Sequence, residues 1–165
     1  MRRKDREMSE DFAINILKNC EYAFISMNDI EGNPYCIPVS PVLENKTLYF
    51  HSAKSGTKTD ILKSNNNVCI SCVGKTNIIP EKFTTEYESA IAFGKAYEIT
   101  DDEYKIHALK LICEKFAKSN MENFNSAIEK SLAITAIWKI EIESITGKRK
   151  KYDLEGKEMK FGRTE

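Results

Sequence analysis

Residues 48–62, LYFHSAKSGTKTDIL, decide the fold that this sequence predicts. The apolar start indicates a strand that ends at His51, SAKSGTK predicts a turn, and TDIL lies in a short helix. A strand that passes through a glycine turn into a helix leaves several backbone N–H groups unpaired at the positive end of the helix dipole. The segment therefore predicts a site suited to a phosphate group.

Several side chains of this turn suit the same ligand. Lys58 is the leading candidate for a phosphate contact, and the hydroxyls of Ser52, Ser55 and Thr57 are additional donors. The GxxxxGK[ST] spacing of a Walker loop is absent, because only Gly-Thr-Lys at 56–58 resembles its end. An ordinary exposed turn that carries lysines remains the alternative.

The preceding segment, PYCIPVSPVL at residues 34–43, predicts an unusual strand. Its prolines at 34, 38 and 41 have no N–H to give to a neighbouring strand, which favours a sheet edge or a bulge. Such an edge keeps free carbonyls and a few free N–H groups. It can therefore bond a flat heterocycle that presents its own donors and acceptors.

Taken together, PYCIPVSP and LYFHSAKSGTKTDIL resemble the flavin-nucleotide-binding split barrels. The most similar branch is the nitroimidazole-resistance type within the pyridoxamine 5'-phosphate oxidase-like superfamily. MRRKDREM at the start, Gly32, ESAIAFGKA at 88–96 and ITGK at 145–148 fit the same pattern in the same order. The resemblance covers about residues 1–148. It implies a mainly β fold with capping helices (α+β), an antiparallel split β-barrel of the FMN-binding type.

The resemblance also implies a function. It predicts an FMN flavoprotein, an oxidoreductase that acts on a small oxidant such as a nitroimidazole, assembled as a homodimer with flavin at the subunit interface. A non-catalytic flavin-binding or sensing module and a haem-binding split barrel, with His51 as axial ligand, are the alternatives. A barrel that binds nucleic acid is a further one, which the neutral charge does not favour.

Site residues follow from the same resemblance. Lys58 corresponds to the phosphate-binding lysine, and Val39 and Ser40 lie where the isoalloxazine edge is contacted. Ser89 occupies the position of a second cofactor contact early in a long strand. His51 is predicted to contact flavin or substrate and to be the candidate catalytic proton donor, although a lone histidine at a strand end is commonly structural.

Two departures from the superfamily pattern argue against oxidation of pyridoxamine phosphate. The phosphate oxidases carry an arginine in the strand that corresponds to PYCIPVSP, and this strand has none. Their substrate-binding arginine and histidine near the C-terminus are also missing. Because lysine does not reproduce the paired hydrogen bonds of arginine, the missing arginine also weakens the expected phosphate site.

Composition predicts one globular domain at residues 1–150 and a polar tail at 151–165, of which residues 153–165 are expected to be partly disordered. The 25 basic and 25 acidic side chains cancel, so there is no field to attract nucleic acid or an anionic membrane. No apolar run indicates a signal peptide or a membrane span, and we expect a cytoplasmic location. The basic run at 148–151 is expected to be part of a solvated tail.

The five cysteines show no disulfide framework, which indicates reduced thiols. Cys69 and Cys72 form a CxxC, but they lie in a predicted strand, where residues three apart point to opposite faces. We therefore expect no metal site and no dithiol from this pair, and interpret both as small apolar core residues.

The order of the other elements favours a closed antiparallel barrel over a doubly wound parallel sheet. Ser9 is expected to cap a first helix, Gly94 to mark a bend, and the TDDE of residues 100–103 to begin another helix. The remaining predicted elements are strands at 22–27, 85–99 and 133–145, a hairpin turn at 28–33, a long loop at 74–83 and a helix at 121–130.

Overall fold

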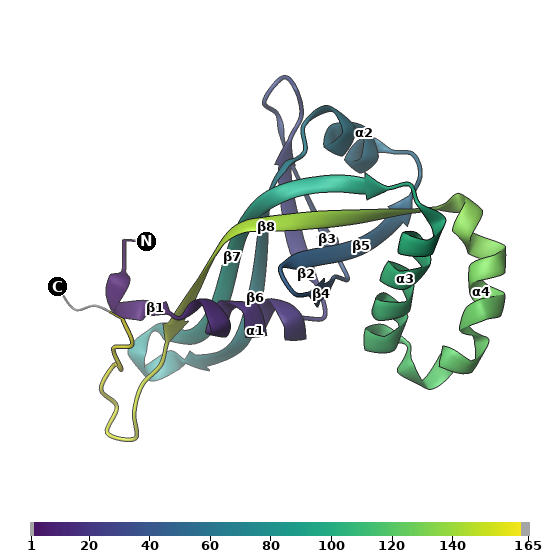
Figure 1. The fold of residues 1–165 in the computed structure, drawn as a ribbon. Coiled ribbons are helices and arrows are strands. Elements are labelled where there is room, and N and C mark those ends of the chain that lie inside the picture. Colours follow the sequence, from purple (N-terminus) through teal and green to yellow (C-terminus); the bar gives the residue numbers. More distant parts are fainter. Residues whose placement is uncertain (1, 163–165) are drawn as a thin grey trace.

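The fold is one antiparallel sheet with helices at its sides and ends (Figure 1). The computed structural model describes residues 2–162. The strands are β1 (Glu7–Met8), β2 (Ala23–Asn28), β3 (Pro34–Val39), β4 (Val42–Glu44), β5 (Thr47–Ala53), β6 (Asn67–Ile79), β7 (Thr84–Ile99) and β8 (Thr135–Lys150). The α-helices are α1 (Glu10–Asn19), α2 (Thr57–Ser64), α3 (Asp102–Phe116) and α4 (Phe124–Ser131). Short 3-10 turns are η1 (Lys4–Arg6), η2 (Pro80–Lys82), η3 (Lys118–Asn123) and η4 (Leu132–Ile134).

The strands pair in the order β3-β2-β6-β7-β8-β5-β4, with β1 added beside β8. The two end strands, β3 and β4, follow each other in the chain, yet they do not pair within the described residues. A closed barrel was therefore the wrong prediction, and the split barrel is confirmed. Pro38 and Pro41 flank the opening, and neither has an N–H with which to bond across it.

Local chemistry explains how two of the helices begin. The Ser9 hydroxyl accepts from the N–H of Phe12 at 3.2 Å, and the Asp101 carboxylate accepts from that of Tyr104 at 2.8 Å. Helix α1 then places Ala13, Ile16 and Leu17 on its buried face. It packs along β7 and β8 and covers one end of the barrel (Figure 1).

Alternate side chains of β5 point into two separate hydrophobic clusters. Leu48 and Phe50 point into the barrel, where Phe50 lies opposite Trp138 of β8, and both of those rings are fully buried. Tyr49 points outward into a second cluster beneath α3. Trp138 is thus a core residue, and β5 is held from both sides where it enters the predicted phosphate turn.

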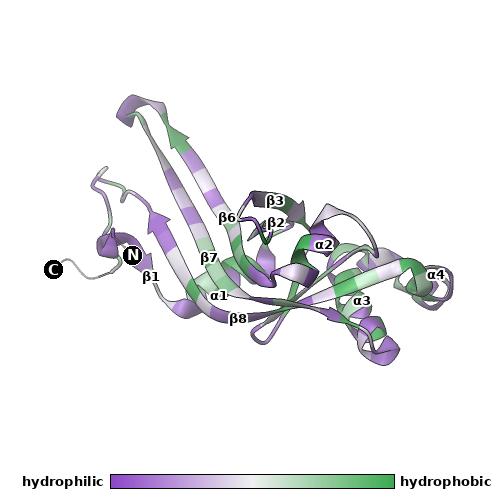
Figure 2. Cartoon of the chain, turned by 90° about the horizontal axis from the view of Figure 1, so that it is seen from above, coloured by the Kyte–Doolittle hydropathy of each residue, from purple (hydrophilic) through white to green (hydrophobic). Residues whose placement is uncertain are grey.

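The predicted loop at 74–83 was wrong. β6 continues to Ile79, turns through η2, and pairs with β7 back from Thr84, so a long hairpin projects away from α3 and α4 (Figure 2). A register shift between Val73 and Thr76 lets the strand pass Gly74. The expected bend at Gly94 is confirmed as a register shift between Phe93 and Gly94, where β7 meets β8.

The C-terminal part also differs from the prediction. Lys148, Arg149 and Lys150 belong to β8 and pair with β7, so the basic run is not a free tail. Tyr152 and Glu158 form an isolated bridge, and Phe161 donates its N–H to Asp5 at 3.0 Å. No helix in the described part of the chain is both long and apolar enough to cross a membrane.

Candidate functional site

The turn between β5 and α2 keeps the geometry expected of an anion site. Gly56 has φ of +125°, a conformation that side-chain-bearing residues rarely adopt, and the helix begins directly after it. No side chain of the described residues caps α2. The first N–H groups of the helix are therefore open to a ligand at its positive end.

Lys58 lies in the first turn of α2, half-buried, with its ammonium 6.0 Å from the ring centroid of Phe50. Partial removal from water lowers its pKa. The same loss of solvent, and the charge of Lys58, lower the pKa of His51. His51 is consequently a neutral imidazole at neutral pH, next to a positive charge that an anion would neutralise.

The predicted hydroxyl donors differ in availability. Thr57 is exposed at the start of α2. Ser52 is buried and already donates its hydroxyl to the carbonyl of Ala53 at 2.9 Å, which Thr59 also approaches at 3.4 Å. The turn thus offers Thr57 as a free donor, whereas Ser52 helps to hold the turn in shape.

Val39 and Ser40 lie at the opening of the barrel, close to the same end. β4 pairs Val42 with Tyr49, and continuing that register by two residues would set Ser40 opposite His51. Val39 is buried in the core, while Ser40 is exposed. The free strand edge at Ser40 and the phosphate turn therefore belong to one region of the molecule.

Ser89 is not brought to this region within one chain. It lies opposite Lys148 of β8, whereas His51 lies opposite Ile137. Eleven residues of β8 separate those positions, roughly 35 Å of strand. Ser89 instead pairs with Val73 on the outer face of the sheet.

Two cavities lie beside the end of α1, and no pattern in the sequence predicted them. One of about 910 Å³ lies between that end, the barrel opening and α3, and Ser40, Cys20 and Lys115 help to line it. A second of about 550 Å³ lies on the side of β6 and β7. Lys115 donates to the carbonyls of Cys20 and Pro41, at 2.8 and 2.7 Å, and so ties the opening to α1. These contacts join three distant segments, so no local pattern predicts them.

The geometry agrees with the comparison to known families. The model of the family described as pyridoxamine 5'-phosphate oxidase matches residues 9–149. This chain belongs to that family. Its split barrel with capping helices is the family's fold, and the family resemblance inferred from the two quoted segments is confirmed.

Similar structures within this fold come from several bacteria. A "putative 5-nitroimidazole antibiotic resistance protein" from Bacteroides thetaiotaomicron is 30% identical, with a TM-score of 0.72 over 87% of this chain and 86% of that one. An FAD- and haem-binding protein from Mycobacterium smegmatis has 17% identity and a TM-score of 0.76, covering 88% and 73% of the two chains. A flavocytochrome from Azotobacter vinelandii has 17% identity and a TM-score of 0.64, covering 95% and 78%. None of the curated proteins matches this chain.

Proposed function

We propose that this family member binds flavin mononucleotide and reduces a small oxidant, such as a nitroimidazole, as a homodimer. The observation that carries the proposal is the uncapped start of α2 behind Gly56, with Lys58 in its first turn. It offers backbone donors, a helix dipole and an ammonium group to one phosphate. The named 5-nitroimidazole resistance relative, at 30% identity, supports the class of oxidant.

In this proposal, different residues of the chain bind the phosphate and the ring of the cofactor. Lys58, Thr57 and the first N–H groups of α2 hold the phosphate, and Ser52 supports the turn. The edge at Val39 and Ser40 faces the planar ring system. When bound, a flavin supplies electron or hydride transfer to small oxidants. His51 would accept or donate a hydrogen bond there, and the lowered pKa of its imidazole favours the neutral form.

A second copy of the chain completes this site in the proposal. Phe24, Val73, Ile91 and Phe93 are exposed on one face of β2, β6 and β7, with Phe93 54% and Val73 57% accessible. Exposed apolar groups that share a sheet face are typical of an interface. Ser89 lies in this patch, directly opposite Val73. A symmetric dimer through the patch would place each Ser89 at the interface, as the proposed second cofactor contact.

The test is the visible spectrum of the purified protein before and after addition of FMN and desalting, followed by titration of FMN. We expect a retained flavin spectrum in the wild type. In Lys58→Met we expect affinity to fall about tenfold or more, because a hydrogen bond to a charged group contributes about 1.5–3 kcal/mol. Lys54→Met, which removes an exposed lysine of the same turn, should bind as the wild type does.

Four results would contradict or change the proposal. A protein that refuses FMN contradicts it, and so does an equal loss of affinity in both lysine variants. A Soret band in place of flavin absorption would indicate haem. If reduced, FMN-loaded protein is reoxidised by oxygen but not by a 5-nitroimidazole under anaerobic conditions, a storage or sensing role replaces the enzymatic one.

A further inference from the structure

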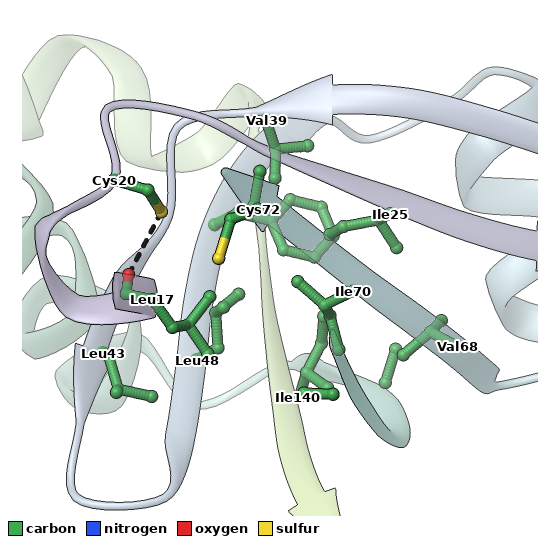
Figure 3. Packing of buried hydrophobic residues seen from close by; sticks show 14 of the residues in the cluster. Leu17, Cys20, Ile25, Val39, Leu43, Leu48, Val68, Ile70, Cys72 and Ile140 are labelled. Atoms are coloured by element: carbon green, nitrogen blue, oxygen red, sulfur yellow. Dashed lines mark hydrogen bonds between the residues drawn. The ribbon is translucent and has the colours of Figure 1, made fainter. Parts of the chain in front are cut away.

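Cys20 and Cys72 come together in the core although they lie far apart in the sequence. Cys20 ends α1, and Cys72 lies on the inner face of β6 (Figure 3). The two side chains are neighbours in one core cluster, they line the same cavity, and they are only 8% and 2% exposed (Figure 3). Cys20 Sγ donates to the carbonyl of Leu17 at 3.1 Å, and Cys72 Sγ donates to that of Ala90 at 3.9 Å. Cys69 points to the opposite face, so the pair formed by the structure is not the CxxC of the sequence.

A lysine makes the two thiols unequal. Lys115 is half-buried and bonded to the carbonyl of Cys20, so its ammonium is held close to both sulfurs. The neighbouring Cys72 thiol and the charge of Lys115 lower the pKa of Cys20. The neighbouring Cys20 and burial raise the pKa of Cys72. Cys20 is therefore the nucleophile of the pair. Cys72 remains a protonated thiol until Cys20 carries a mixed disulfide.

Small molecules can reach the nucleophile. Cys20 lines both cavities at the end of α1, whereas Cys72 lines only the one beside β6 and β7. Phe24 and Val73 rim that second cavity, and the proposed dimer would cover them. The cavity beside α3 has none of the four patch residues in its lining, and it presents Cys20 together with Lys115.

We propose that Cys20 and Cys72 form a redox-active dithiol that reduces small organic disulfides entering the cavity beside α3. The Cys20 thiolate attacks one sulfur of the disulfide, the S–S bond breaks, and the first half leaves as a thiolate that takes up a proton. Cys72 then loses its proton and attacks Cys20 Sγ, which forms the Cys20–Cys72 disulfide and releases the second half. Two electrons and two protons pass from the cysteines to the small disulfide.

The other cysteines supply a matched control. Cys36 and Cys69 both lie opposite Ser26, on the two strands that flank β2. Two strand spacings, about 9.5 Å, separate their backbones, beyond the roughly 7 Å that a disulfide spans. Cys36 is exposed, so it reports the reactivity of an ordinary surface thiol.

The experiment uses the wild-type chain and a C36S/C69S/C113S variant, each incubated with 2-hydroxyethyl disulfide and followed by intact mass and peptide mapping. We expect the variant to lose two hydrogens, and both proteins to yield a linked Cys20–Cys72 peptide. Adding Cys72→Ser should trap the mixed disulfide on Cys20. Adding Cys20→Ser should abolish reaction, and Lys115→Met should slow it.

Mapping of the wild type decides the proposal even if a variant folds poorly. A wild-type protein in which only Cys36 is modified, or in which Cys20 and Cys72 react only after denaturation, overturns it. So does a Cys20→Ser variant that reacts at Cys72 as fast as the Cys72→Ser variant reacts at Cys20.

Discussion

Gly94 shows how a single residue fixes the curvature of the sheet. A Cβ at this position would overlap the carbonyl oxygen of Glu141 and lie 3.0 Å from the carbonyl carbon of that residue. Both are backbone atoms of the facing strand β8, which has little freedom to move. Only glycine lets β7 and β8 approach here, at the register shift that bends the strand.

We expect Gly94→Ala to lower the free energy of unfolding by about 1–3 kcal/mol, as overpacking of a well-filled site does. Gly74→Ala is the matched control, because the three atoms nearest to its new methyl belong to side chains, at 3.0 Å or more, and none is a backbone atom of the facing strand. Urea denaturation at constant m-value measures both. Equal losses in the two variants would show that the backbone clash is not the cause.

Some residue roles were readable from the sequence and others were not. Gly94 interrupts a strand pattern, and Gly56 and Lys58 sit in a turn whose consequences are local. The partnership of Cys20 with Cys72 and the bridging bonds of Lys115 depend on contacts between three elements. No spacing in the chain carries that information, and both cysteines resemble ordinary core residues.

At the scale of elements, the length of the β6–β7 hairpin was not predicted, and the reason is physical. Residues 74–77, GKTN, are polar and carry no alternation of apolar side chains, so they resemble a loop. β6 nevertheless continues through them, because the backbone of β7 pairs with it again from Thr76 to Ile79 after the register shift. Pairing extends beyond the apolar core here, and propensity alone does not predict that.

Ion pairs join the N- and C-terminal segments, and composition did not predict them. Arg3 bonds Asp5 at 2.6 Å, Arg6 bonds Glu158 at 2.7 Å, and Lys160 bonds both acids. The hydrogen bond from Arg6 lowers the pKa of Glu158 from 4.5 to about 2, and Arg3 holds that of Asp5 well below its usual range. These pairs fasten the tail predicted to be partly disordered.

We expect acid to detach residues 152–162 from the N-terminal segment. A carboxylate whose pKa is lowered by folding stabilises the folded form above its unfolded pKa, and the contribution is lost as the pH falls through the folded one. We therefore expect the segment 152–162 to lose protection between about pH 4.5 and pH 2, measured by hydrogen exchange. Glu158→Gln should loosen it at pH 7, whereas Glu155→Gln should not. A tail still protected at pH 2 would contradict this account.

At the scale of the whole molecule, the split barrel was predictable because the family pattern runs along nearly the entire chain. The sequence did not predict which of the proposed site residues lie close together in the fold. The turn between β5 and α2 and Ser40 lie near one end of the sheet, whereas Ser89 of β7 pairs with Lys148, eleven residues along β8 from the partner of His51. One chain therefore holds two separated halves of the proposed site.

A homodimer through Phe24, Val73, Ile91 and Phe93 would unite halves from different copies, and Phe93→Glu tests it. A buried charge without a partner is costly, so we expect a wild-type dimer and a variant monomer in sedimentation velocity, with weaker FMN binding. Ile30→Glu, at an exposed hairpin tip with 79% accessibility, should leave both properties unchanged. A wild-type monomer that binds FMN tightly would show that one chain suffices, and Ser89 would then have no place in the site.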